Sequence, residues 1–248
     1  MQNKILLREC MAELCGTLFI LLFGDGACAM NSLFNLGEYV TVSFGWGLAV
    51  LFGILVSTRI SGAHLNPAVT LSLVLTKRFP ARKLPFYVLS QMIGAFLGAA
   101  IVYYFYQAKF AIVDPNLSHS SAIFTTFPAV NAFIPSLMSE LIASAILLFG
   151  ILTIVDHFTL DKAQFLAPFT VALLVIAIGL SFGGMHGYGM NPARDFSPRL
   201  LITLLGFQNN GLTDNSYIWT QGIIGPLIGG PLGAFLYDYT IGRKINIS

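Results

Sequence analysis

Long apolar stretches alternate with short polar connections along most of the chain. A helix needs about 20 consecutive apolar residues to span the hydrocarbon core of a bilayer. Six stretches reach this length, and we predict them as membrane-spanning helices at roughly 10–31, 39–60, 84–106, 134–155, 166–184 and 217–239. Since lipid offers no partners to backbone polar groups, stretches of this length are expected to be helical. The pattern predicts an all-α membrane protein.

Two further apolar stretches, near 67–76 and 192–204, are too short to span a bilayer. Each begins with Pro directly after Asn. Asn is favoured at the N-cap of a helix, and Pro is favoured at the first helical position. We therefore predict two half-helices that begin inside the membrane.

The two halves of the chain resemble each other. The second half contains SELIASAILLFG, GYGMNPARDFSPRL and GPLIGGPLGA, which match AELCGTLFILLFG, SGAHLNPAVTLSL and QMIGAFLGA of the first half. We divide the single domain 1–248 into repeats 8–106 and 134–240, joined by an external connection 107–133. Because each repeat holds an odd number of spans, the second copy is inverted in the membrane. Inverted repeats place their functional site at the interface between the copies, near the midplane.

Composition supports a membrane protein and excludes several other classes. Hydrophobic residues make up 56% of the chain and charged residues 10%, whereas a soluble domain carries roughly 25% charged residues. A net charge of +2 gives no reason to expect a nucleic-acid partner. The spacing of Cys10, Cys15 and Cys28 fits neither a zinc site nor a disulfide framework. No nucleophile–base–acid set, phosphate loop or metal cluster indicates an enzyme or a cofactor.

Lysine and arginine predict the orientation, because cytoplasmic loops are enriched in them. With an even number of spans, both termini lie on one side of the membrane. That side holds Lys4, Arg8, Arg59, Lys77, Arg78, Arg82, Lys83, Lys162, Arg243 and Lys244. The opposite side holds Lys109, and otherwise only Arg194 and Arg199 near the second half-helix. We therefore expect a cell-membrane protein with both termini in the cytoplasm.

Each half-helix opens with an Asn-Pro-Ala tripeptide, Asn66-Pro67-Ala68 and Asn191-Pro192-Ala193. Inversion brings the half-helices in from opposite faces, so their N-termini meet at the centre. Each N-terminus carries roughly half a positive charge, and each Asn can cap its own helix while aiming its amide into a lumen. Such a centre holds water or hydroxyl oxygens and opposes cations and protons.

Non-helical backbone leads into each half-helix and has to present its carbonyls to water or protein. We expect a ladder of pore carbonyls from Gly62, Ala63, His64, Leu65, Gly187, Gly189 and Met190. No second metal ligand stands near His64, so we interpret it as a packing residue that orients its loop. Glu13 and Glu140 either relay protons or accept hydrogen bonds from loop amides behind each half-helix. The recurrence of the glutamate in both repeats favours the second role, as acceptors of hydrogen bonds from the loops.

The segments SGAHLNPAV and GMNPARDF and the paired glutamates resemble the major intrinsic protein family, over residues of about 8–240. The resemblance implies an aquaporin-like fold of six spans plus two re-entrant half-helices, with a pore in each chain of a homotetramer. It also implies a selectivity filter formed by Trp46, Gly179, Tyr188 and Arg194.

The filter that the resemblance implies fits glycerol. Gly179 stands where water-selective relatives have His, which leaves a wider pore. Trp46 and Tyr188 offer an apolar corner for CH groups, and Arg194 offers donors to hydroxyls. Asp195 follows Arg194 as in aquaglyceroporins, and we interpret it as structural support. The resemblance therefore implies passive, ion-excluding permeation of glycerol and water, with urea, ammonia and metalloid acids as further candidates.

Three positions depart from the glycerol-channel pattern. Tyr188 replaces the usual Phe, and Gly222 stands where Pro is usual. Asp25, in the outer half of the first span, faces either an outer vestibule or a subunit contact, because facing lipid would be costly. Two other functions stay open. A water-selective aquaporin needs a narrower filter, and an ion-coupled secondary transporter would saturate at low substrate concentration.

Overall fold

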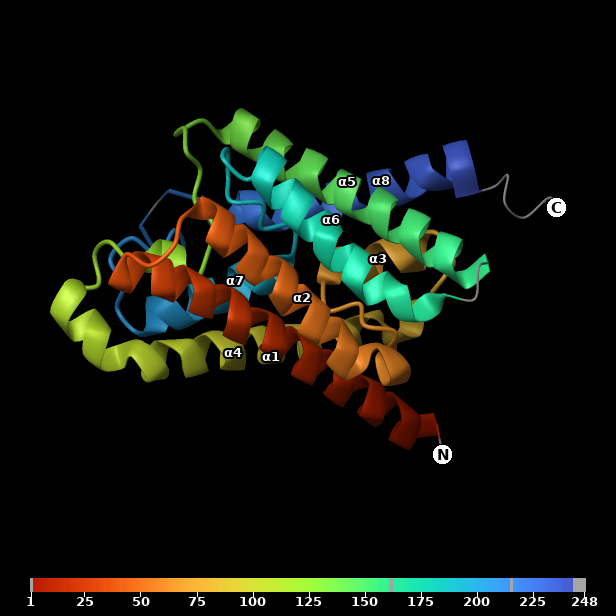
Figure 1. The fold of residues 1–248 in the computed structure, drawn as a ribbon, viewed down its shortest axis with the longest axis horizontal. Helices are drawn as coiled ribbons and strands as arrows, with labels where there is room; N and C mark the ends of the chain where they lie inside the picture. Colours follow the sequence, from red (N-terminus) through yellow and green to blue (C-terminus); the bar gives the residue numbers. More distant parts are fainter. Residues whose placement is uncertain (1, 161–162, 215, 243–248) are drawn as a thin grey trace.

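The computed structural model describes residues 2–160, 163–214 and 216–242, which are helical over most of their length (Figure 1). The long elements are α1 (Gln2–Phe34), α2 (Tyr39–Ser61), α3 (Pro67–Leu75), α4 (Leu84–Val113), α5 (Phe133–Leu160), α6 (Ala167–Phe182), α7 (Pro192–Leu204) and α8 (Trp219–Tyr237). Short turns of other helix types are η1 (Ala81–Lys83), η2 (Ser121–Ile123), η3 (Gln164–Leu166) and η4 (Asp238–Gly242). Each predicted span or half-helix corresponds to one of the long elements, and the predicted all-α architecture is confirmed.

The helices run along the longest axis of the molecule, with the half-helices α3 and α7 in opposite halves (Figure 1). The start of α1 and the end of α8 lie at the same end. Two ion pairs join the loop after α3 to this end: Lys83 donates to Glu9 at 2.7 Å, and Arg78 donates twice to Asp238 at 2.6 and 2.8 Å. Lys162, Arg243 and Lys244, which we assigned to the same side, lie outside the described residues.

Four stretches of the described residues are long and apolar enough to cross a membrane: Tyr39–Ser61, Ala81–Val113, Phe133–Thr159 and Gln164–Phe182. The other two spans of the fold, α1 and α8, contain less typical residues. In α8 these are Pro226 and Pro231 among several glycines. In α1 they are Glu13 and Asp25, and both are completely buried inside the protomer. Asp25 therefore faces neither a vestibule nor a subunit contact, and both of its predicted locations are wrong.

Equivalent helices of the two repeats pack in the same way, α1 against α4 and α5 against α8. In both pairs, glycines of one helix lie so close to backbone carbonyls of the other that a Cβ atom would not fit. These contacts join Gly94 and Gly98 to Leu14 and Leu18, and Gly229 and Gly233 to Leu141 and Ala145. Small residues at such contacts let membrane helices approach closely. The resemblance between the repeats thus extends from sequence to packing.

The third span is longer than we predicted. Helix α4 continues to Val113, so the predicted external connection 107–133 begins as helix. The cause is an aromatic cluster, in which Phe110 is buried against Phe124 and Phe207. Burying large aromatic surfaces stabilises the added turns.

Asp114 folds the chain directly after α4. Its carboxylate accepts hydrogen bonds from the backbone N–H groups of Ser118, His119 and Ser120 at 2.9, 2.9 and 3.0 Å. Burial raises the pKa of Asp114, but these hydrogen bonds outweigh it and hold the pKa well below its usual range. The carboxylate is ionised at neutral pH and fixes the turn that leads through η2 towards α7.

Candidate pore and selectivity site

A cavity of about 1000 Å³ lies between the repeats and draws its lining from both. Asn66 and Asn191 line its middle. Trp46, Tyr188 and Arg194 line the half towards the external connection, whereas the opposite half ends among residues that include Arg78 and Asp156. The sequence-predicted residues of both motifs therefore meet around one continuous space.

The two asparagines cap their own half-helices and also connect them. The Oδ1 atom of Asn66 accepts from the backbone N–H of Ala68 at 2.8 Å, and that of Asn191 accepts from Ala193 at 3.0 Å. Each amide nitrogen crosses the junction: Asn66 donates to the Met190 carbonyl at 2.8 Å, and Asn191 donates to the Leu65 carbonyl at 2.9 Å. An amide has two N–H donors. One is used across the junction, so one per asparagine is left for the cavity.

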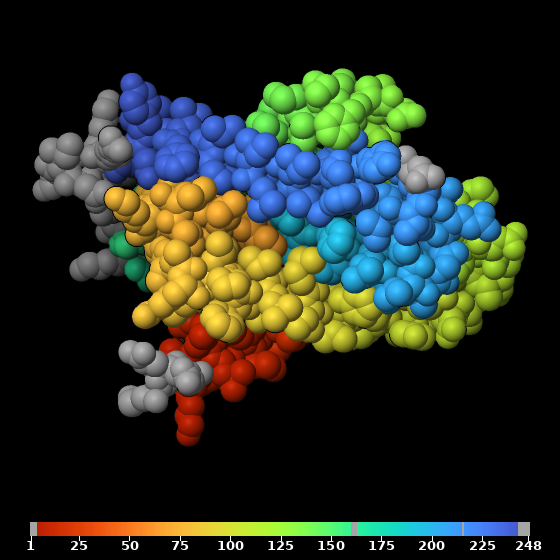
Figure 2. All heavy atoms as spheres, turned by 180° about the vertical axis from the view of Figure 1, so that it is seen from behind, coloured from red at the N-terminus to blue at the C-terminus, as the bar shows by residue number. Residues whose placement is uncertain are grey.

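The remaining residues of the tripeptides do not line this cavity. Ala68 and Ala193 are completely buried. Pro67 and Pro192 line a separate apolar hollow of about 270 Å³. It lies on the outer face, where α3 and α7 reach the surface between α4 and α8 (Figure 2). Both prolines shape the first helical turn, and within each tripeptide only Asn faces the central space.

The backbone before each asparagine has the same unusual conformation in both repeats. Three residues in each loop have positive φ: Gly62 (88°), Ala63 (55°) and Leu65 (54°), and Gly187 (84°), Tyr188 (41°) and Met190 (50°). Positive φ is uncommon outside glycine, so surrounding contacts have to hold it. Gly62, Ala63, His64, Leu65, Gly189 and Met190 line the cavity.

Gly187 differs from the prediction. It is absent from the cavity lining: a Cβ atom at Gly187 would lie 3.1 Å from the Thr126 side chain, and its N–H donates to the Gly183 carbonyl at 2.8 Å. A contact with the external connection, which sequence alone does not reveal, takes this residue away from the lumen.

A buried glutamate holds each of these loops. Glu13 accepts from the backbone N–H groups of His64 at 2.9 Å and Leu65 at 2.7 Å. Glu140 accepts from the N–H groups of Gly189 at 2.8 Å and Met190 at 2.7 Å. In both cases the two carboxylate oxygens each bind one loop amide. This geometry supports the acceptor interpretation over a proton relay.

Arg194 and Trp46, two residues of the expected constriction, stack on each other in the cavity wall. The guanidinium carbon of Arg194 lies 4.1 Å from the centroid of the Trp46 ring, and Nη1 donates to the Phe124 carbonyl at 3.3 Å. Trp46 in turn packs on Gly24 of α1, where a Cβ atom would collide with the ring. Neither Gly24 nor the Phe124 carbonyl was predicted from the sequence. The stack holds a positive charge against the wall of the cavity.

Gly179 influences the cavity indirectly, through the side chain of Tyr188. It is not among the lining residues, and a Cβ atom there would lie 2.9 to 3.1 Å from atoms of the Tyr188 side chain. The Tyr39 hydroxyl donates to the Gly179 carbonyl at 3.1 Å. The small residue therefore gives the Tyr188 ring its place, and the predicted direct contribution to the lumen is corrected.

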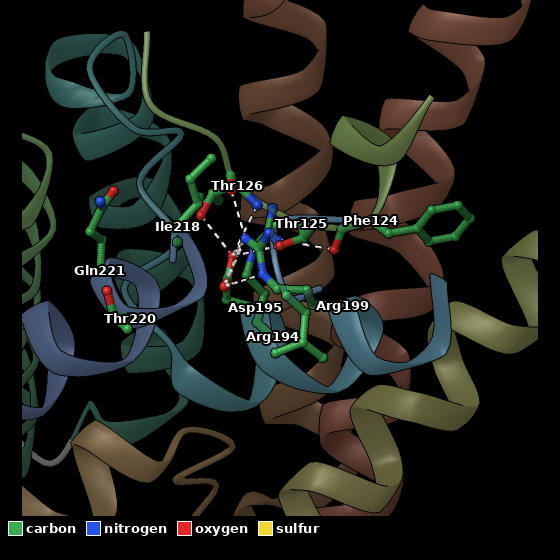
Figure 3. Close-up of polar contacts among 12 residues, drawn as sticks. Phe124, Thr125, Thr126, Arg194, Asp195, Arg199, Ile218, Thr220 and Gln221 are labelled. Atoms are coloured by element: carbon green, nitrogen blue, oxygen red, sulfur yellow. Dashed lines mark hydrogen bonds and ion pairs between the residues drawn. The ribbon is translucent and has the colours of Figure 1, made fainter. Parts of the chain in front are cut away.

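Asp195 and Arg199 tie α7 to the external connection (Figure 3). Both side chains are completely buried. Asp195 accepts from the Thr125 hydroxyl at 2.8 Å, from the Thr126 N–H at 2.9 Å, and from Arg199 at 3.1 and 3.2 Å. Arg199 also donates to the Thr126 carbonyl at 2.7 Å. This network holds in place the segment whose Phe124 carbonyl binds Arg194.

Comparison with known proteins places this geometry in a family. The sequence profile described as major intrinsic protein matches residues 1–237. The chain belongs to the major intrinsic protein family.

Similar members of the major intrinsic protein family cover nearly the whole chain. The probable glycerol uptake facilitator protein of Thermotoga maritima is 42% identical over 233 residues, which is 92% of this chain and 97% of that protein. The glycerol uptake facilitator protein of Bacillus subtilis is 37% identical over 241 residues, 95% of this chain and 86% of that protein. The X-ray structure of the Plasmodium falciparum aquaglyceroporin matches with a TM-score of 0.87 at 32% identity, covering 98% of this chain and 100% of that one.

This major intrinsic protein contains a buried histidine that was not predicted from the sequence. His186 is completely buried, with Nδ1 3.3 Å from Glu140 Oε1 and Nε2 3.0 Å from Gln221 Oε1. In the first repeat the equivalent position is Ser61, which donates to Glu13 at 2.6 Å. Both residues stand at the same distance before their asparagine, so aligning the repeats could have found the pair.

Gly222 gives the Asp195 carboxylate its space, which explains one departure from the glycerol-channel pattern. A Cβ atom at Gly222 would lie 2.5 Å from Oδ2 and 2.6 Å from Cγ of Asp195. Because hydrogen bonds hold that carboxylate, Gly222→Ala is expected to destabilise the channel by roughly 1–3 kcal/mol. Thermal unfolding in detergent tests this. The control is Gly26→Ala, where no atom lies within 4 Å of the added carbon; equal unfolding temperatures for the two variants would contradict the steric argument.

Proposed function

We propose that this chain is a channel for passive permeation of glycerol and water that excludes ions. The observation that carries the proposal is the composition of the constriction. Trp46 and Tyr188 supply aromatic surface to the cavity, and Arg194 supplies hydrogen-bond donors beside them. A linear polyol has one CH edge and one hydroxyl edge, and such a wall matches both at once.

Exclusion of ions follows from the centre of the cavity. The N-termini of α3 and α7 meet there, and each contributes a partial positive charge. The free amide donors of Asn66 and Asn191 suit oxygen acceptors and repel cations. With Arg194 at the constriction, a cation meets positive potential at two successive places.

The names of the relatives support glycerol as the permeant, since proteins up to 42% identical are described as glycerol uptake facilitators. Urea, ammonia and metalloid acids are further candidate permeants because they are small and uncharged. We further propose that the chain works in the cell membrane as a homotetramer with one pore in each chain and both termini cytoplasmic. The gathering of Arg78 and Lys83 at the end that holds the start of α1 supports this orientation.

Stopped-flow light scattering on proteoliposomes tests the function. Wild-type protein is expected to accelerate both water efflux and glycerol entry over protein-free vesicles. Gly179→His is expected to reduce glycerol entry by roughly tenfold while water flux stays measurable, because any side chain there pushes Tyr188 towards the lumen. Gly26→Ala serves as the matched control in another helix.

Each alternative predicts a different result. Water flux without glycerol flux in the wild type would favour a water-selective pore. Saturation at low glycerol concentration together with dependence on an ion gradient would favour a secondary transporter. Undiminished glycerol flux in Gly179→His would remove the argument from pore width.

A further inference from the structure

Tyr188 lines the cavity, yet no hydrogen bond of its own fixes the position of its ring. The side chain is buried, and its hydroxyl has no hydrogen-bond partner in the part of the chain that the structure describes. The neighbouring Ser43 hydroxyl donates to the Tyr39 carbonyl at 2.9 Å. The place of the Tyr188 ring in the cavity wall therefore depends on the groups that pack against it.

Two glycines at the end of α6, one helical turn apart, make room for the Tyr188 ring. A Cβ atom at Gly179 would lie 2.9 Å from Cζ and 3.1 Å from the hydroxyl oxygen of Tyr188. A Cβ atom at Gly183 would overlap both the Tyr188 ring and the Tyr39 hydroxyl. Tyr39 and Tyr188 therefore share the space that α6 leaves open.

Tyr39, the first residue of α2, packs directly on the Tyr188 ring. The two rings meet edge to face, with centroids 6.4 Å apart and an interplanar angle of 79°, which is a favourable aromatic arrangement. The Tyr39 hydroxyl donates to the Gly179 carbonyl at 3.1 Å, which joins the start of α2 to the end of α6. Trp46 follows about two turns later in α2, so it projects from the same face of the helix as Tyr39. Tyr39 thus links three residues of the predicted filter without being one of them.

Tyr39 itself is not a lining residue of the cavity, and it is 45% exposed. The Gly179 carbonyl also accepts from the Gly183 N–H at 3.1 Å. Loss of the Tyr39 hydroxyl would therefore leave no unpaired carbonyl at this position. Because a half-exposed side chain at a helix start contributes little to the core, the main contact of Tyr39 to account for is the one with Tyr188.

We propose that Tyr39 is a specificity-determining positioning residue, which holds the Tyr188 ring towards the cavity and thereby sets the upper limit on solute size. This inference rests on the proposed channel function. With Tyr39 in place, the Tyr188 ring is confined between the Tyr39 ring and the backbone of α6. Without the Tyr39 ring, Tyr188 gains space on a side that does not line the cavity, and the filter widens.

The test compares the entry of glycerol and of xylitol, a larger linear polyol, into proteoliposomes. In Tyr39→Ala the xylitol-to-glycerol ratio is expected to rise by roughly fivefold, because the Tyr188 ring withdraws from the cavity. Tyr39→Phe keeps the packing ring and is expected to stay within roughly twofold of wild type. Tyr104→Ala is the matched control with an unchanged ratio, since Tyr104 forms a similar edge-to-face pair with Tyr103 at 5.5 Å but does not line the cavity.

A double variant shows whether Tyr39 acts through Tyr188. Tyr188→Ala is itself expected to raise the xylitol-to-glycerol ratio, and the addition of Tyr39→Ala is expected to raise it no further. A further rise in the double variant would show that Tyr39 acts on the solute directly, and would overturn the positioning role. An unchanged ratio in folded Tyr39→Ala would overturn it as well.

Folding and function are separated by two further outcomes. If Tyr39→Ala fails to fold, Tyr39→Leu takes its place with the same expected direction, and failure of both variants to fold overturns the proposal in favour of a structural role. A wild type without glycerol flux counts against the proposed function. A wild type with glycerol flux and an unchanged ratio in Tyr39→Ala counts against the role of Tyr39 alone.

Discussion

Glu140→Ala is expected to destabilise the folded channel by about 3–5 kcal/mol. The substitution leaves the buried N–H groups of Gly189 and Met190 without their acceptor, at 2.8 and 2.7 Å in the intact protein. It also removes the carboxylate next to the buried ring of His186. Met190 has positive φ, so the loop backbone is not held by the hydrogen bonds of a regular helix or strand. Thermal unfolding in detergent, followed by tryptophan fluorescence and size-exclusion chromatography, measures the loss.

The repeat provides a matched pair for this prediction. Glu13→Ala removes the acceptor of the His64 and Leu65 N–H groups. It is expected to lower the stability of the folded channel by a similar amount. Glu140→Gln keeps one acceptor oxygen, so its stability is expected to lie between those of wild type and Glu140→Ala. Proton flux decides the competing interpretation. A Glu140→Ala channel with wild-type stability and altered proton movement would favour a relay.

The features predicted correctly from sequence are those with a local or repeated cause. The two helix starts after Asn66 and Asn191 could be predicted, because Asn at the N-cap followed by Pro is a local preference of the chain. Glu13 and Glu140 were identified as a pair because the same residue recurs in both repeats. Neither argument required knowledge of which distant segments touch, and both motifs meet in the structure as the inversion requires.

The features missed from sequence depend on contacts between distant segments. The external connection carries no motif in the sequence, yet it delivers the Phe124 carbonyl to Arg194 and the Thr126 backbone to Asp195. In sequence Gly222 is only a departure from the glycerol-channel pattern, whereas in the structure the Asp195 carboxylate occupies the space that a side chain at position 222 would need. Both predicted locations of Asp25 are wrong, because an acid in a span has no periodicity that reveals what covers it. The partners of Arg194 and Asp195 lie in the connection, and the partner of Gly222 lies in another helix of the same repeat.

Arg194→Ala is expected to abolish the discrimination against cations and against solutes wider than glycerol. The guanidinium lines the cavity, stacks on Trp46 at 4.1 Å and donates to the Phe124 carbonyl at 3.3 Å. Truncation removes its volume and its fixed positive charge together. Potassium permeability is therefore expected to rise by at least roughly tenfold, whereas glycerol flux is retained. Reversal potentials and the entry of longer linear polyols into proteoliposomes measure the two effects.

The other buried arginine of α7 is the control for this result. Arg199 carries the same charge but binds Asp195, the Thr126 carbonyl and the Asn210 carbonyl, and it does not line the cavity. Arg199→Ala is expected to lower the thermal stability while the folded fraction keeps its selectivity, because no group at the constriction is removed. Equal selectivity changes in the two variants would show that the loss comes from disruption of α7. A change confined to Arg194→Ala places the barrier to cations at the stacked guanidinium, which holds a fixed positive charge in the cavity wall.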